Sequence, residues 1–229
     1  TLILPADAAW NTTDTEPVTA GPASAPPAPN PEAIESAVRA LRGDARCTLF
    51  LGGAITEHRA RLASELSAAT GAKVLASTWA PRVETGAGRA PIARLAYFGE
   101  QAAEQLDGTE HLVVVGGQPP VTFFAYPDKP NWLTPEGAEI HQVCDATDDI
   151  DAALGALVDA TAGTGGAART LPLDRPTLPT GALDPSAIGA AVAALMPEHA
   201  IVVNEAGTAG AYQAAMRGAP PHSLLSLTG

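Results

Sequence analysis

The hydrophobic pattern of this chain changes its period from one block to the next. Short apolar runs that suit buried strands alternate with longer segments in which apolar residues recur every three or four positions, as on one face of a helix. Residues 112–115 are apolar throughout, which is expected for a central parallel strand covered on both faces. The predicted strands are Cys47–Leu51, 73–77, 112–115 and 139–143.

The predicted helices lie between these strands and have recognisable ends. Pro31 suits the first turn of a helix that Gly43 ends. Strands and helices in alternation predict an α/β domain of Rossmann-like type, with a parallel sheet, over residues 31–162. The other predicted helices are one that passes through Leu62, Leu66 and Ala69 and stops at Gly71, one at Gly99–Leu106, and one at 148–161, where acidic residues suit the positive N-terminal dipole.

Two stretches rich in proline and glycine bracket this unit. Residues 12–30 and 163–182 cannot propagate a helix or a sheet ladder, so we expect both to be linkers. Before the first linker, residues 1–10 predict one buried strand followed by a loop. Because the chain opens on Thr1 and this strand has no nearby partner in the sequence, we expect the chain to be an internal piece of a longer protein.

Composition narrows the classes of function. The chain has 229 residues, is 46% hydrophobic and carries a net charge of −12 with only 13 Lys and Arg, which argues against nucleic acid as a partner. No run approaches the ~20 apolar residues that span a bilayer, so no membrane is expected. Cys47 and Cys144 lie in strand-like runs and are interpreted as buried free thiols, with a disulfide or reactive thiol as the alternative. A cytoplasmic location is therefore expected.

The most informative segment is 200–210, a short apolar strand followed by a turn of small residues. It leads into a helix-compatible segment at 211–217. Free backbone N–H groups at such a helix start can hold a phosphate with little steric obstruction. The alternative is that 204–210 merely caps a helix.

The other glycine turns give weaker signals. No Gly-x-Gly-x-x-Gly follows a strand, so Gly52-Gly53 and Gly116-Gly117 are interpreted as ordinary turns rather than a site for NAD. The loop at 85–89 carries one cation, Arg89, that could reach a phosphate. A plain surface loop is the alternative interpretation.

Other site chemistries find no support in the spacing. The sequence Asp148-Asp149-Ile150-Asp151 is interpreted as an acidic helix start rather than a metal cluster. The serines lack a Gly-x-Ser-x-Gly setting, which argues against a hydrolase. The five histidines show neither His-x-x-x-His nor Cys-His spacing, so no metal ligands are predicted. These histidines are His58, His111, His141, His199 and His222.

Three segments resemble the large subunit of acetolactate synthase and its relatives among the thiamine diphosphate enzymes, including benzoylformate decarboxylase. They are residues 2–6, residues 123–127, and 201–210 followed by 222–229. The resemblance implies a domain order over the whole chain. Residues 1–11 would end a pyrimidine-binding domain, 12–30 and 163–182 would be linkers, 31–162 would be the central domain, and 183–229 would begin a diphosphate-binding domain.

The same resemblance implies the activity and its site. The family decarboxylates 2-oxoacids or joins them to a second carbonyl compound, with thiamine diphosphate and Mg2+ as cofactors. Its catalytic Glu would precede residue 1 and its metal motif would follow residue 229, so neither catalytic nor metal residues are predicted in this chain, and the chain alone is expected to be inactive. The cofactor-binding residues implied by the resemblance are Glu205, Gly207, Thr208, Ala209, Gly210, Thr228 and Gly229.

Two further expectations concern partners and flavin. The complete enzyme would be a homodimer or homotetramer acting on a small 2-oxoacid. FAD, which acetolactate synthases proper hold across the central domain, is not expected, because Pro119 and Pro120 remove two N–H donors beside a strand end. The aromatic run at 123–127 is better suited to packing at a domain interface. The alternative to the enzyme is a non-catalytic Rossmann-like binding or regulatory module.

Overall fold

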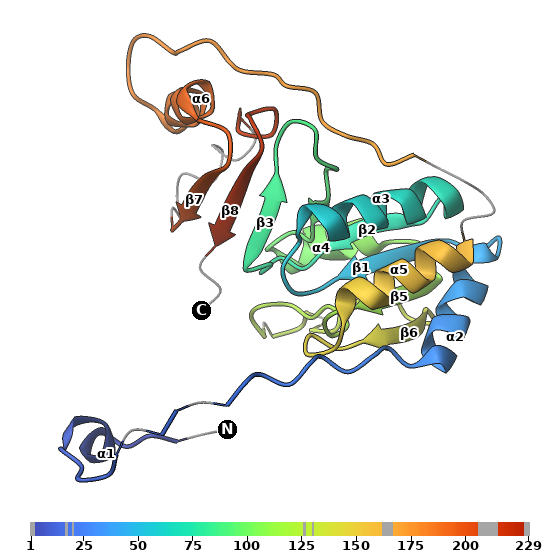
Figure 1. Ribbon diagram of the computed structural model, residues 1–229. Helices are drawn as coiled ribbons and strands as arrows, with labels where there is room; N and C mark the ends of the chain where they lie inside the picture. The colour runs from blue at the N-terminus through green and yellow to red at the C-terminus, as the bar shows by residue number, and fades with distance from the viewer. Residues whose placement is uncertain are drawn as a thin grey trace.

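A five-stranded parallel sheet forms the larger part of the fold (Figure 1). The computed structural model describes residues 3–16, 18–19, 21–125, 127–129, 131–161, 167–205 and 215–226. The predicted α/β class with a parallel sheet is confirmed. In the order β4-β2-β1-β5-β6, the strands are β4 (Ala93–Arg94), β2 (Lys73–Ala76), β1 (Cys47–Leu51), β5 (His111–Val115) and β6 (Glu139–Cys144).

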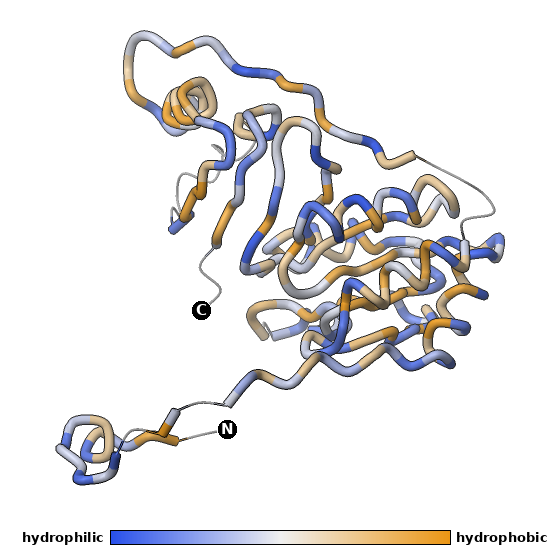
Figure 2. Tube along the Cα trace, in the orientation of Figure 1, coloured by the Kyte–Doolittle hydropathy of each residue, from blue (hydrophilic) through white to orange (hydrophobic). Residues whose placement is uncertain are grey.

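Both faces of this sheet are covered, because alternate side chains of each strand point to opposite sides. Leu49 and Val113 pack into the core under three helices, while Phe50 and Val114 pack into a second core under one helix. The central strands β1 and β5 are therefore mostly apolar, with Thr48 and His111 as their polar residues (Figure 2). The three helices on the first face are α2 (Pro31–Arg42), α3 (Glu57–Thr70) and α5 (Ile150–Thr161), and the helix on the second is α4 (Gly99–Leu106).

Local sequence explains where the helices begin and end. The Asn30 side chain accepts a hydrogen bond from the Glu32 N–H at the start of α2, and Thr56 caps α3 in the same way through the Arg59 N–H. Gly71 ends α3 in the left-handed conformation, with φ +75°. The start of α2 at Pro31 and the helix ends at Gly43 and Gly71 agree with the prediction.

A second, three-stranded sheet joins segments that are far apart in the sequence. β8 (His222–Ser226) pairs in parallel with β7 (Ala200–Asn204) and antiparallel with β3 (Arg82–Thr85). Sequence analysis left residues 82–85 without an element. Helix α6 (Pro185–Leu195) covers one side through a small core of Ala193, Met196, Met216 and Ala219.

The N-terminal segment differs from its prediction. Residues 6–10 form a short helix, α1 (Ala6–Trp10), that lies apart from both sheets, and residues 3–5 belong to no strand (Figure 1). The prediction of a buried strand is wrong here, because Ile3 and Leu4 are 84% and 63% exposed. No described strand lies beside them to complete a ladder. None of the helices in the described part of the chain is both long and apolar enough to cross a membrane.

Candidate functional site

The carboxyl ends of β7 and β8 lie side by side, since the two strands are parallel and Asn204 pairs with Ser226. Ligands of α/β sheets commonly bind at this edge. Glu205 leaves β7 here with an exposed side chain. The Ser226 Oγ is buried and has no hydrogen-bond partner among the described residues. Glu205 is the one predicted cofactor residue among the residues that the structure describes, and it lies at this edge. The other six lie outside the described residues, namely Gly207, Thr208, Ala209, Gly210, Thr228 and Gly229.

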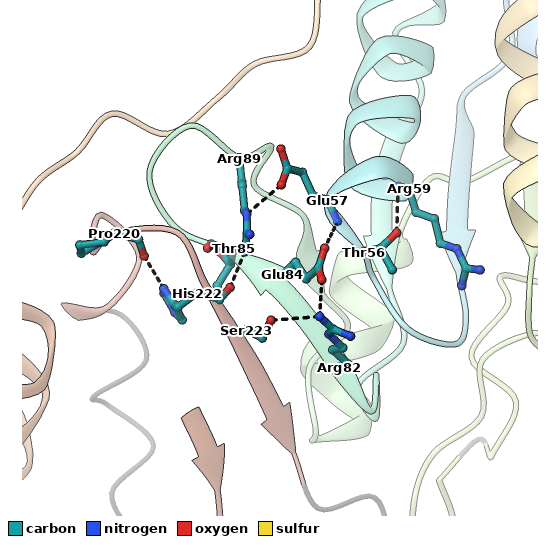
Figure 3. A network of polar contacts seen from close by, with 10 residues as sticks. All are labelled: Thr56, Glu57, Arg59, Arg82, Glu84, Thr85, Arg89, Pro220, His222 and Ser223. Carbon is teal, nitrogen blue, oxygen red and sulfur yellow. Dashed lines mark hydrogen bonds and ion pairs between the residues drawn. The ribbon is translucent and has the colours of Figure 1, made fainter. Parts of the chain in front are cut away.

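The amino end of β3 completes the same edge. The Ser226 N–H donates to the Pro81 carbonyl at 3.3 Å. Arg82 donates to Glu84 Oε1 at 2.5 Å and to Ser223 Oγ at 3.4 Å (Figure 3). The charge of Arg82 is therefore already paired within the sheet.

The predicted loop at 85–89 is a packed connection between the two sheets. Arg89 is only 9% exposed, and its guanidinium donates to the His222 carbonyl at 2.6 Å (Figure 3). Its Nε also forms an ion pair with the Glu57 carboxylate at 3.2 Å. Both interpretations of the loop, a plain surface loop and a free cation for a phosphate, are therefore wrong. The segments that bury the loop come from elsewhere in the chain, so its local sequence could not reveal them.

The backbone of the same loop is also occupied. The Ala87 N–H donates to the Ala219 carbonyl, and the Gly88 N–H donates to the Leu171 carbonyl, each at 2.8 Å. A Cβ on Gly86 would lie 2.5 Å from the Pro220 carbonyl oxygen. These contacts leave the loop little capacity to bind a phosphate through its amides.

The sheet order reverses between β1 and β5, where an open α/β sheet usually holds its ligand. Here the two glycine turns meet each other. A Cβ on Gly52 would lie 2.3 Å from the Gly116 carbonyl oxygen, and a Cβ on Gly116 would lie 2.5 Å from Ile150 Cδ1. The two turns and Ile150 therefore pack too closely for a Cβ at either glycine, which explains why glycine occupies both positions.

An aromatic cluster lies beside the carboxyl ends of β1, β2 and β5. Phe123 packs against Trp79 with ring centroids 4.9 Å apart and against Phe124 at 4.6 Å, while Tyr97 and Phe98 extend the cluster. A cavity of about 250 Å³ opens between these rings and the 118–122 turn. The Phe123 and Phe98 side chains remain 55% and 57% exposed, so the cluster presents an apolar surface to whatever lies next to it.

Other candidate groups have structural partners. Cys47 and Cys144 are free thiols, as predicted, and desolvation raises the pKa of each.

The acidic segment at 148–151 starts α5, since Asp149 Oδ1 accepts the Ala152 N–H. Asp151 forms a bidentate pair with Arg59 on α3, and the side-chain hydrogen bond from this guanidinium lowers the pKa of Asp151.

Comparison with known proteins then identifies the relatives of this architecture. No protein-family model matches the chain. The chain is 43% identical over 232 residues to a Mycobacterium tuberculosis protein provisionally named acetolactate synthase large subunit IlvX, and the match covers 100% of this chain and 44% of that protein. The predicted resemblance is confirmed. The chain is similar in sequence to this acetolactate synthase large subunit-like protein.

Solved structures show the same fold as this chain. A provisionally assigned thiamin diphosphate-dependent enzyme from Mycobacterium smegmatis superposes with a TM-score of 0.61 at 20% identity, covering 96% of this chain and 46% of its own. A 4-hydroxybenzoylformate decarboxylase from Rhodococcus jostii RHA1 gives 0.59 at 17% identity, with coverages of 97% and 44%. A benzoylformate decarboxylase from Polynucleobacter necessarius gives 0.57 at 16% identity, with coverages of 96% and 44%. The chain thus spans less than half the length of each relative.

Sequence reasoning missed part of how the chain builds this region. Strand β3 and the burial of Arg89 depend on pairing with β8, 141 positions away between Arg82 and Ser223. A usable signal was present, because Arg82, Val83 and Glu84 alternate in polarity as in a half-buried strand.

Proposed function

We propose that this chain supplies the central domain and the first part of the diphosphate-binding domain of a thiamine diphosphate-dependent 2-oxoacid decarboxylase or carboligase of acetolactate synthase-like type. The observation that carries the proposal is 43% identity across the full length of the chain to an acetolactate synthase large subunit-like protein. In this proposal, residues 31–162 and 183–229 belong to the two domains, 12–30 and 163–182 are linkers, and 1–11 end a pyrimidine-binding domain.

One described residue at the carboxyl edge of β7 and β8, Ser226, supports a cofactor site, and the sequence of the following turns supports it further. The Ser226 hydroxyl lies there without a hydrogen-bond partner in the described part of the chain and can bind a polar group. Gly207 and Gly210 follow β7 in sequence and offer backbone N–H groups without a Cβ to obstruct a phosphate. Thr208 and Ala209 would contact the diphosphate from the same turn, and Thr228 and Gly229 would face the aminopyrimidine.

The chain's own contribution to catalysis would be binding and orientation. When bound, thiamine diphosphate supplies an electron sink for the carbanion left when a 2-oxoacid loses CO2. Glu205 and the following turn would orient the diphosphate end, while the β3–β8 ladder would hold the edge rigid against the central domain. Mg2+ would bind with ligands from outside this chain.

An uncovered apolar face supports the view that further protein packs on the second sheet. Ile201 and Val203 on β7 are 69% and 67% exposed, on the side of the strand away from α6. Exposed apolar surface of this kind commonly marks an interface. We expect the remaining part of the diphosphate-binding domain to cover β7 and the complete enzyme to be a homodimer or homotetramer, which light scattering on a sizing column can measure.

Titration calorimetry on the complete enzyme that contains this chain tests the proposal. With Mg2+ present, thiamine diphosphate should bind, and purified enzyme should release CO2 from pyruvate or benzoylformate. Gly207→Val should weaken cofactor binding by about tenfold or more, because a branched Cβ obstructs the approach of the phosphate. Gly21→Val is the matched control, since nothing lies within 4 Å of a Cβ at Gly21.

Two outcomes would overturn the proposal. Absence of thiamine diphosphate binding by the complete protein would favour the non-catalytic binding or regulatory module. Equal affinity in Gly207→Val and Gly21→Val would show that the 204–210 turn only caps a helix. The 229-residue chain alone should release no CO2, because the proposed catalytic Glu and metal ligands lie outside it.

A further inference from the structure

Two histidines and a glutamate converge on one face of the five-stranded sheet. His111 opens β5 and Glu139 opens β6 directly beside it, since the two residues are paired in the parallel ladder. His141 follows two positions along β6 and therefore points to the same face as Glu139. This is the face that α2 covers (Figure 1).

The ligand atoms of these side chains are spaced as they would be around one small cation. His111 Nδ1 lies 3.0 Å from His141 Nε2. The Glu139 carboxylate lies 3.6 Å from His111 Nδ1 and 3.8 Å from His141 Nε2. Atoms bound to Zn2+ at about 2.0–2.2 Å lie roughly 3–4 Å from one another. The three side chains therefore need little movement to share a metal ion.

A second contact prepares His141 for this role. Its other ring nitrogen, Nδ1, lies 2.9 Å from the Ser36 hydroxyl on α2. When Nδ1–H donates to Ser36, the lone pair of the neutral ring is at Nε2, which faces His111. Metal-binding histidines are typically oriented by such a hydrogen bond through the nitrogen that does not bind the metal.

Burial differs across the cluster. The His141 side chain is 5% exposed and lies beneath α2. Glu139 is 65% exposed, so its side of the cluster is open to solvent and a water could complete the coordination.

We propose that His111, His141 and Glu139 bind a divalent transition-metal ion of the Zn2+ class, with water as a further ligand. Two imidazoles and one carboxylate suit Zn2+, Co2+ or Ni2+ better than Mg2+, which prefers oxygen ligands alone. The site joins the amino ends of β5 and β6 to α2 through Ser36. It does not depend on the proposed function.

The alternative is a hydrogen-bonded pair of histidines that only fixes α2 on the sheet. Metal titration separates the two. The untagged full chain, stripped with a chelator, is titrated with Zn2+ by calorimetry and with Co2+ by visible absorption. We expect one equivalent to bind with a dissociation constant in the micromolar range or tighter, and Co2+ to give the absorption of a coordinated ion. Mg2+ should give no competing heat.

Variants assign the ligands. His111→Ala and His141→Ala should each weaken Zn2+ binding about 100-fold or more, and His58→Ala, on the exposed face of α3, should leave it unchanged. Glu139→Gln keeps the exposed side chain and both histidines, so it tests the site without threatening the fold, and it should weaken binding about tenfold or more. Absence of Zn2+ binding, or equal binding in Glu139→Gln and the unsubstituted protein, would overturn the proposal in favour of the hydrogen-bonded pair.

Discussion

The two sheets of this chain are stabilised very differently. The five-stranded sheet buries both faces under α2, α3, α5 and α4, with two apolar cores whose buried residues all lie between Ala37 and Leu157. Among the described residues, the three-stranded sheet has a small core of four buried side chains and leaves alternate side chains of β7 exposed. The same strand geometry therefore gives a self-contained unit in one region and an incompletely covered one in the other. What differs is how much apolar surface the neighbouring helices supply.

The largest effect is expected in the core of the five-stranded unit. Leu154 on α5 is fully buried, so Leu154→Ala should lower the free energy of unfolding by about 2–5 kcal/mol. Val203→Ala on the exposed side of β7 should change it by no more than about 0.5 kcal/mol. Urea unfolding of both variants measures the difference, and similar losses would mean that β7 is covered after all.

A smaller effect is expected at the connection between the two regions. Arg89→Ala leaves the His222 carbonyl without its donor and Glu57 without its cation, which should cost about 1–3 kcal/mol. Arg82→Ala removes a more exposed pair and should cost less than about 1 kcal/mol. Hydrogen exchange should show faster opening of β8 in Arg89→Ala, with β1 unchanged. Uniform loss of protection in both sheets would contradict a local role for Arg89.

Acid should weaken the second sheet through His222. Desolvation lowers the pKa of this buried ring from 6.5, and Arg89 adds to the effect, although a hydrogen bond to the Pro220 carbonyl opposes it. The unfolded chain then binds the proton more readily, so the contribution of His222 is complete above pH 6.5 and declines as the pH falls below it. Exchange rates of β8 amides between pH 7.5 and 5.5, corrected for intrinsic rates, should show this decline. His222→Gln should remove the pH dependence, and its persistence would assign the effect to another group.

The smallest expected signal concerns flavin at the five-stranded sheet. Gly52 and Gly116 approach each other closely between β1 and β5, Ile150 lies beside them, and Pro119 and Pro120 supply no N–H donors. The intact protein that contains this chain, purified without added flavin, should therefore show no flavin absorption. A stoichiometric band that is released on denaturation would contradict this prediction.

Sequence reasoning succeeded where structure follows from neighbouring residues. The strands β1, β2, β5 and β6 and the helices α2 to α5 follow from period, capping and glycine stops. It failed where partners are remote. The strand β3 and the convergence of His111 with His141 depend on which strands lie side by side, which spacing alone does not reveal.

The prediction of a buried strand in the first ten residues failed for a different reason. An apolar run such as Leu2–Leu4 suits a buried strand only when a partner strand and a covering layer are present. In the described structure neither lies beside it, and α1 forms next to it instead. An apolar run predicts that the segment packs against other protein, but it does not say which part of the protein supplies the partner.

The pairing of β3 with β8 also bears on how the chain folds as it leaves the ribosome. The five-stranded unit has all its strands once residue 144 has been made, whereas β3 must wait for a partner that is synthesised much later. Contacts between segments so distant in sequence form slowly, and an unpaired strand can meanwhile associate with other chains. The ion pair between Arg89 and Glu57 lies entirely within the earlier part. This ion pair can hold the loop after β3 in position during that delay, so that β8 pairs with a strand that is already in place.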